Sequence, residues 1–200
     1  PRRRHWPRIA AREGADALMV EKYGFLGGAA TTSNVLAYCG FFQQGETPIK
    51  AVGGVADLVL DELRELGLDC KPFCSPTTLN WIILLEPESV KLALDRVLSK
   101  AGTDILLHTR VAAVTRTADR IQSVTLAGME GRRRVAAQAF VDATGDANLS
   151  MLAGLMCRIG NDRSHLQAAS ATNCIGGRDR SVPSDRDALI AGFEIYSRTG

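Results

Sequence analysis

Hydrophobic and polar positions along this chain alternate with the period of a helix in some segments and with the period of a strand in others, as in a mixed α/β protein. Apolar residues at helical spacing predict two helices that end at Gly67 and near Gly102. They cover residues 55–66 and 87–102. Short apolar runs predict strands over 17–21, 81–85, 104–108 and 139–144. Between residues 23 and 55 the chain is rich in glycine, threonine and serine, so an irregular segment is expected there.

A different pattern lies between the last two of these strands. Three segments alternate apolar and polar residues and are separated by turn residues, which predicts an antiparallel meander. They are 111–115, 121–126 and 134–139, with turns at 118–120 and 127–131. The strand over 139–144 is then expected to return to a parallel sheet, and a helix is predicted over 149–156.

Two strand ends carry residues suited to a nucleotide. The run ALMVEKYGFLGGAAT, residues 17–31, places Glu21 directly after an apolar strand and ahead of Gly27 and Gly28. An acid at the carboxyl end of a Rossmann strand accepts hydrogen bonds from ribose hydroxyls, and glycines let backbone approach a ligand closely. The later run FVDATGD ends in a second acid, Asp146. One ligand bridging both strand ends is therefore expected.

The runs EKYGFLGG and VDATGD together resemble the FAD-dependent oxidoreductases of the glutathione-reductase-like superfamily. The nearest likeness is to the heterodisulfide reductase-like flavoproteins, with a distant likeness to fumarate reductase flavoproteins. Further similar segments are 51–67, 86–111 and 174–179, so the resemblance covers nearly all of residues 9–180. It implies an α/β, Rossmann-like FAD-binding domain over 9–154, with a parallel sheet and a meander. Residues 155–200 would begin a substrate or capping domain.

The resemblance also implies non-covalent FAD and assigns residues to it. They are Glu21, Gly27, Gly28, Thr31, Val111, Thr144, Gly145 and Asp146. Glu21 would bind the ribose, Thr31 the phosphate or ribityl chain, and the Val111 backbone the adenine. Asp146 would hold the ribityl hydroxyls, although a helix N-cap is an equally open reading. The redox step would belong to the isoalloxazine ring, and the substrate or redox partner is not predicted.

No catalytic residue is assigned from the sequence. His108, beside a strand, is expected to be structural, and His165 is the histidine to test for acid–base chemistry.

The first residues depart from the family pattern. A GxGxxG loop is expected about 20 residues before the acid, whereas residues 1–15 read PRRRHWPRIAAREGA. We therefore expect residues 1–8 to be an atypical leader that need not be native, and the flavin domain to lack its first strand and a carboxyl-terminal portion. One alternative is a non-catalytic remnant unable to bind FAD. A less favoured alternative is an NAD(P)-dependent dehydrogenase.

The composition of the chain argues against nucleic-acid-binding and membrane-spanning proteins. The chain is 46% hydrophobic and 23% charged, which is typical of a soluble globular protein. Its net charge of +2 predicts no nucleic-acid partner, and arginines 2–4 are expected to form a solvated tail. The longest apolar run, 81–85, is too short for a membrane span. A cytoplasmic location follows as the default.

The cysteines predict neither a disulfide framework nor a metal site. There are five, an odd number, scattered widely along the chain. Cys70 and Cys74 form the one close pair, with a spacing one residue too long for a redox CxxC. Relatives of the resembling branch can carry iron–sulfur clusters, but the chain has no compact cysteine motif for one. Inert thiols are expected.

Overall fold

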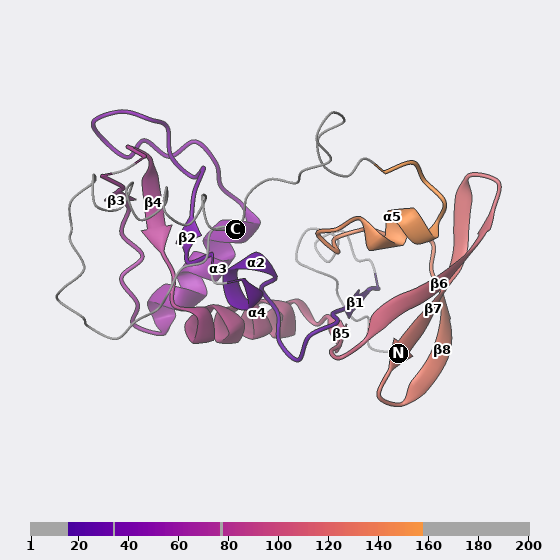
Figure 1. Ribbon diagram of the computed structural model, residues 1–200. Helices are drawn as coiled ribbons and strands as arrows, with labels where there is room; N and C mark the ends of the chain where they lie inside the picture. The colour runs from indigo at the N-terminus through magenta and orange to yellow at the C-terminus, as the bar shows by residue number, and fades with distance from the viewer. Residues whose placement is uncertain (1–15, 34, 77, 158–200) are drawn as a thin grey trace, which may run out of the picture.

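The computed structural model describes residues 16–33, 35–76 and 78–157 of the chain (Figure 1). Predictions for the leader, for His165 and for the segment 158–200 lie outside these residues. The described part is a mixed α/β protein with one parallel and two antiparallel sheets, which confirms the predicted fold class. Two parallel strands lie between a helical part and the meander (Figure 1). Within the described residues, no helix combines the length and apolarity needed to cross a bilayer.

The parallel pair consists of β1 (Leu18–Val20) and β5 (Asp104–Leu106). Leu18 lies opposite Asp104 and Val20 opposite Leu106, so both strands end at the same edge of the sheet. Both strands were predicted from apolar runs. Parallel neighbours need a long crossover, and here the helical part provides it.

The two predicted helices form with the expected boundaries, as α3 (Val55–Glu65) and α4 (Pro87–Ala101). Glu86 caps α4, because its carboxylate accepts hydrogen bonds from the backbone N–H groups of Glu88 at 3.0 Å and Ser89 at 2.6 Å. Gly102 ends α4 with a φ of 68°, a left-handed conformation that glycine adopts without strain. The inner faces of both helices supply the larger hydrophobic core. Its largest fully buried side chains are Leu60, Leu63, Ile83 and Val90.

A small antiparallel sheet of order β2-β4-β3 packs on these helices. Its strands are β2 (Ala37–Tyr38), β4 (Trp81–Leu84) and β3 (Phe73–Cys74). The segment 23–55, predicted to be irregular, is mostly so, but it also contains β2 and a one-turn helix, α2 (Ala29–Thr32). Two-residue strands and single turns carry no periodic signal, because they are too short to show one.

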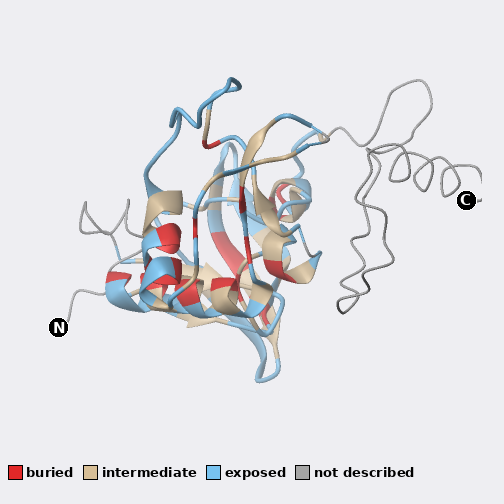
Figure 2. Cartoon of the chain, turned by 90° about the vertical axis from the view of Figure 1, so that its left-hand side faces the viewer, coloured by how far each residue is buried: buried red, intermediate tan, exposed pale blue. Residues whose placement is uncertain are grey.

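The predicted meander is present as β6 (Arg110–Thr117), β7 (Arg120–Gly128) and β8 (Gly131–Ala136). One face packs on a second hydrophobic cluster, in which Val124 and Leu126 meet Leu149 of α5 (Asn148–Leu152). The helix α5 is shorter than the predicted 149–156. Buried residues lie along the inner sides of the helices and the middle of the strands (Figure 2).

The predicted strand over 139–144 is wrong, because these residues form no ladder. Phe140 packs beside Leu18 and Val20 in the second cluster, so the segment does lie against the parallel pair. Asp142 then bonds to nearby Thr144 and Ser150. Such local side-chain bonds compete with extended backbone and turn the chain instead.

Candidate functional site

The carboxyl ends of β1 and β5 are tied together by backbone hydrogen bonds. Glu21 N–H donates to the Leu106 carbonyl at 2.8 Å, and Thr109 N–H donates to the Glu21 carbonyl at 2.9 Å. The chain leaving β5 therefore crosses the end of β1 and enters β6 beside Glu21. This crossing brings two predicted site residues, Glu21 and Val111, onto adjoining segments.

Only one of the two carboxylate oxygens of Glu21 accepts a hydrogen bond from a described residue. Its Oε1 accepts a hydrogen bond from Tyr23 N–H at 2.9 Å. Its Oε2 accepts no hydrogen bond from any described residue. The side chain is half-buried, so an acceptor remains open at the tip of β1.

The Gly27–Gly28 loop is shaped around Thr31. Gly27 has a φ of 118°, and a Cβ there would lie 2.4 Å from Thr31 Cγ2, so only glycine fits. The Thr31 side chain is buried and its hydroxyl donates to the Leu26 carbonyl at 2.7 Å. A Cβ on Gly28 would meet no atom within 4 Å, so the backbone there borders open space. Thr31 thus holds the loop, and its contact with a cofactor stays a prediction.

The loop after residue 140 is organised by Asp142, which the sequence analysis did not single out. Its Oδ1 accepts from the Thr144 hydroxyl at 2.7 Å, and its Oδ2 accepts from Ser150 N–H at 2.9 Å and the Ser150 hydroxyl at 2.7 Å. Partial burial acts to raise the pKa of Asp142, but these hydrogen bonds outweigh it and lower the pKa to about 2. A signal existed in the sequence: aspartate often accepts from the backbone N–H two residues on, and here Thr144 N–H donates to Asp142 Oδ1 at 3.1 Å.

Asp146 does not cap α5. The N-cap residue is Ala147, with no side-chain cap, and Thr144 Oγ1 instead accepts from Asn148 N–H at 2.8 Å. The N-cap alternative for Asp146 is therefore wrong. Thr144, Gly145 and Asp146 are all exposed, and Asp146 forms no hydrogen bond with a described residue.

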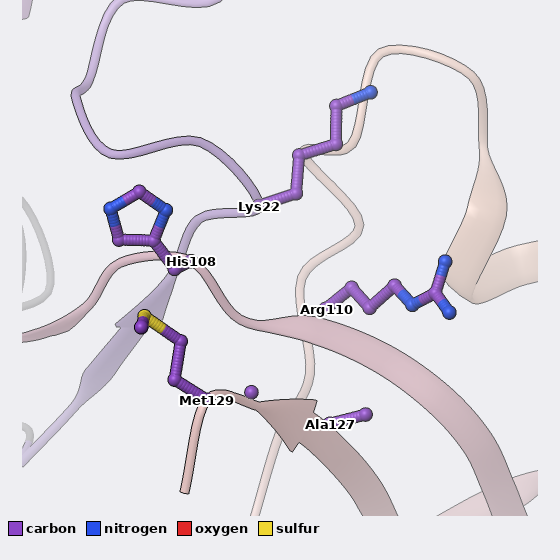
Figure 3. Close-up of a pocket in the computed structure, with 6 residues that line it drawn as sticks. Lys22, His108, Arg110, Ala127 and Met129 are labelled. Atoms are coloured by element: carbon purple, nitrogen blue, oxygen red, sulfur yellow. The ribbon is translucent and has the colours of Figure 1, made fainter. Parts of the chain in front are cut away.

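An open cleft of about 360 Å³ is bordered by Lys22, the residue that follows Glu21 (Figure 3). It is lined by Lys22, His108, Arg110, Ala127, Gly128 and Met129. Lys22 and Arg110 extend to one side of it, while Met129 points toward His108 (Figure 3). His108 has a φ of 49°, and its ring lies where a Cβ on Gly24 would be, 2.6 Å from Cε1. The cleft is thus cationic on one side and closely packed on the other.

The described cysteines are free thiols, and no three metal-binding side chains cluster in this part of the chain. Cys70 is buried and donates to the Leu60 carbonyl at 3.8 Å. Burial raises the pKa of its thiol, which disfavours the reactive thiolate.

Comparisons with known proteins support the resemblance seen in the sequence. Residues 8–197 match the family model described as FAD dependent oxidoreductase. A search of the curated proteins gives no match. A solved structure of THI4 from Thermovibrio ammonificans is 14% identical, with a TM-score of 0.45, over 73% of this chain and 56% of its own.

Two other solved structures are similarly distant. A geranylgeranyl bacteriochlorophyll reductase-like protein from Thermoplasma acidophilum is 15% identical over 81% of this chain and 40% of its own, with a TM-score of 0.48. The anhydrotetracycline hydroxylase OxyS from Streptomyces rimosus is 16% identical over 72% and 30%, also with a TM-score of 0.48. The chain thus spans less than two thirds of each structure. Because the family model matches nearly the whole sequence, this chain belongs to the FAD dependent oxidoreductase family.

Proposed function

We propose that this chain binds FAD non-covalently and forms part of a flavin-dependent oxidoreductase acting on an unidentified substrate. The observation that carries the proposal is the family match over residues 8–197. When bound, FAD supplies the redox chemistry through its isoalloxazine ring, and the protein supplies binding and orientation. The role of the chain's own residues is therefore to bind FAD and to orient it.

The adenosine end of FAD fits the tip of β1. The open Glu21 Oε2 is an acceptor for a ribose hydroxyl, while Tyr23 N–H holds the other oxygen in place. The Val111 backbone belongs to β6, an edge strand of the meander. An edge strand leaves backbone N–H and C=O groups facing away from the sheet, and these are the groups that an adenine ring needs.

The remaining contacts come from the two loops. The backbone at Gly28 borders open space, so a phosphate or ribityl group can approach it without meeting a side chain. The Asp146 carboxylate is exposed and is an acceptor for ribityl hydroxyls. Asp142 is a positioning residue, because its bonds to Thr144 and Ser150 fix the loop that carries Asp146.

The wider assignment follows the resemblance. Residues 9–154 form the FAD-binding domain and 155–200 begin a substrate or capping domain, in a cytoplasmic enzyme of the heterodisulfide reductase-like branch. The competing candidates are a remnant that does not bind FAD and an NAD(P)-dependent dehydrogenase. In the described residues, no metal-binding cluster supports an iron–sulfur centre.

Titration with FAD separates these candidates. The purified 200-residue chain should quench FAD fluorescence and show flavin absorbance after removal of free cofactor. Glu21→Gln should weaken FAD binding about tenfold, equivalent to about 1.4 kcal/mol. Glu88→Gln removes the same charge from the exposed side of α4 and should change affinity less than about twofold.

Each opposing outcome has a clear meaning. Failure of the wild-type chain to bind FAD under conditions where it is folded supports the remnant. Saturable binding of NADPH with no FAD binding supports the dehydrogenase. Equal losses for Glu21→Gln and Glu88→Gln would remove Glu21 from the ribose site while leaving flavin binding intact.

A further inference from the structure

Arginines concentrate on the meander. Residues 110–136 contain six arginines, no lysine and two acids, Asp119 and Glu130. Both acids lie at turns, at the ends of the strands. The meander is therefore strongly cationic, although the whole chain has a net charge of only +2.

The strand register gathers three of these arginines at one end of one face. Arg110 on β6 lies opposite Ala127 on β7, which in turn lies opposite Arg132 on β8. Directly paired residues project from the same side of an antiparallel sheet, and so do residues two apart on a strand, which adds Arg134. We call Arg110, Arg132 and Arg134 the arginine face. All three are exposed, and Arg110 also lines the cleft beside Lys22 (Figure 3).

The arginine face has no charge partner in the described part of the chain. None of its members takes part in an ion pair or hydrogen bond with a described residue. The helical part is different, because its cations are repeatedly paired. Those pairs are Lys50–Asp57, Arg64–Asp61, Lys71–Asp69, Lys91–Glu88 and Lys100 with Glu62 and Glu65.

The fold does not need this face for its core. The opposite face of the meander carries Val111, Val124 and Leu126, which pack in the second hydrophobic cluster. Arg116 also lies on that inner face, and its guanidinium donates to the Ala153 carbonyl at 2.6 Å. Around the arginine face the neighbours are small: Ala113, Thr115, Ser123, Thr125, Ala127 and Ala136. The side chains that surround the three arginines on this face are thus all short.

We propose that the arginine face binds an acidic segment of a partner protein. Guanidinium groups recognise carboxylates through paired hydrogen bonds, which favours Arg over Lys at such a surface. Arg132 and Arg134 are two residues apart, about 7 Å, and an extended acidic segment presents alternate carboxylates at the same interval. A nucleic-acid strand is disfavoured, because none of the residues on this face is aromatic and none can stack on a base.

Binding of a fluorescent deca-glutamate peptide, followed by anisotropy at about 50 mM salt, tests the proposal. The double variant Arg132→Gln/Arg134→Gln should bind the peptide at least about fivefold more weakly than wild type. The control Arg64→Gln/Lys71→Gln removes two paired cations from the helical part and should change binding less than about twofold. Wild-type binding should also weaken steeply at about 300 mM salt.

Three results would overturn the proposal. Equal losses in the two double variants would mean that the peptide responds to net charge alone. Absence of saturable binding would mean that the arginines only keep the exposed edge strand β8 from pairing with a strand of another chain. Tighter binding of a ten-nucleotide single-stranded DNA than of the peptide at the same salt would assign the face to nucleic acid. None of these measurements depends on bound flavin.

Discussion

Replacing Asp142 by asparagine removes the acceptor that organises the loop between Phe140 and α5. The substitution preserves size, and Oδ1 can still accept from Thr144. In wild type, the N–H and the hydroxyl of Ser150 both donate to Oδ2. In the variant, an NH₂ group takes the place of that oxygen. The bond from Ser150 N–H is lost and that donor faces the NH₂ group, whereas the Ser150 hydroxyl can rotate to accept from it.

The size of the effect follows from these contacts. A hydrogen bond to a charged group contributes about 1.5–3 kcal/mol, and less where solvent reaches it. Asp142 is only partly buried, so losing the Ser150 N–H bond and the charged acceptor of the Ser150 hydroxyl should lower the free energy of unfolding by about 2–3 kcal/mol at neutral pH. Asp146→Asn is the matched control, since it removes one charge from the same loop without a described hydrogen bond. Its effect should stay within about 0.5 kcal/mol.

The difference between wild type and Asp142→Asn should also depend on pH. The pKa of Asp142 is lowered from 3.8 to about 2 in the folded chain. A depressed carboxyl pKa stabilises the fold above the unfolded value, and that contribution is lost as pH falls from about 5 through 2. The shift corresponds to at most about 2.5 kcal/mol, and solvent screening reduces it to about 1–2 kcal/mol. The gap between the two proteins should narrow by that amount in acid.

Urea unfolding followed by far-ultraviolet circular dichroism gives the free energies at each pH. Hydrogen exchange of the Ser150 amide reports the loop itself, and this amide should exchange faster in Asp142→Asn. An unfolding free energy equal to wild type at neutral pH would refute the assigned network. A gap that stays constant down to about pH 2 would refute the attribution to the ionised carboxylate.

Two further predictions concern the glycine loop and the thiols. Gly27→Ala should lower the free energy of unfolding by about 2–4 kcal/mol, because a Cβ would lie 2.4 Å from Thr31 at a φ of 118°. Gly28→Ala meets no atom within 4 Å and strains only its backbone, with a φ of 51° and a ψ of −120°, so it should cost less, about 1–2 kcal/mol. Thermal unfolding measures both, and equal losses would contradict the packing argument. Iodoacetamide should label the exposed Cys39 at least about tenfold faster than buried Cys70, as read by peptide mass spectrometry; equal rates would show that Cys70 is not protected by the fold.

Helices and strands are predicted correctly from the sequence where their apolar spacing repeats several times. The helices α3 and α4 and the meander were predicted closely, because each repeats its apolar spacing over several turns or pairs. The apolar run at 139–144 gave a wrong strand prediction, since an apolar run does not show whether its residues are buried or paired, and Val141 is in fact exposed. Phe140 is partly buried, yet the segment turns at Asp142, and the sequence does not reveal which backbone partner a strand has.

The candidate site was predicted less completely, because its residues act through tertiary neighbours. Position after a strand identified Glu21 from the sequence, and the Tyr23 and Thr109 contacts explain how it is held. Thr31 looked like a ligand donor, but its hydroxyl proton is directed to Leu26 inside the loop. Asp142 was passed over in favour of Asp146, because chain pattern alone does not show which of two nearby acids meets Ser150.

The net charge of the sequence likewise does not show which cations remain unpaired after folding. A net charge of +2 predicts no polyanionic partner, because the sum treats every cation as equivalent. Folding pairs the cations of the helical part with nearby acids and leaves those of the meander face without a partner in the described chain. An electrostatic interaction depends on the local field of the unpaired groups, and beyond about 8–10 Å at physiological salt the rest of the molecule contributes little. The arginine face can therefore bind an acidic segment even though the chain as a whole is nearly neutral.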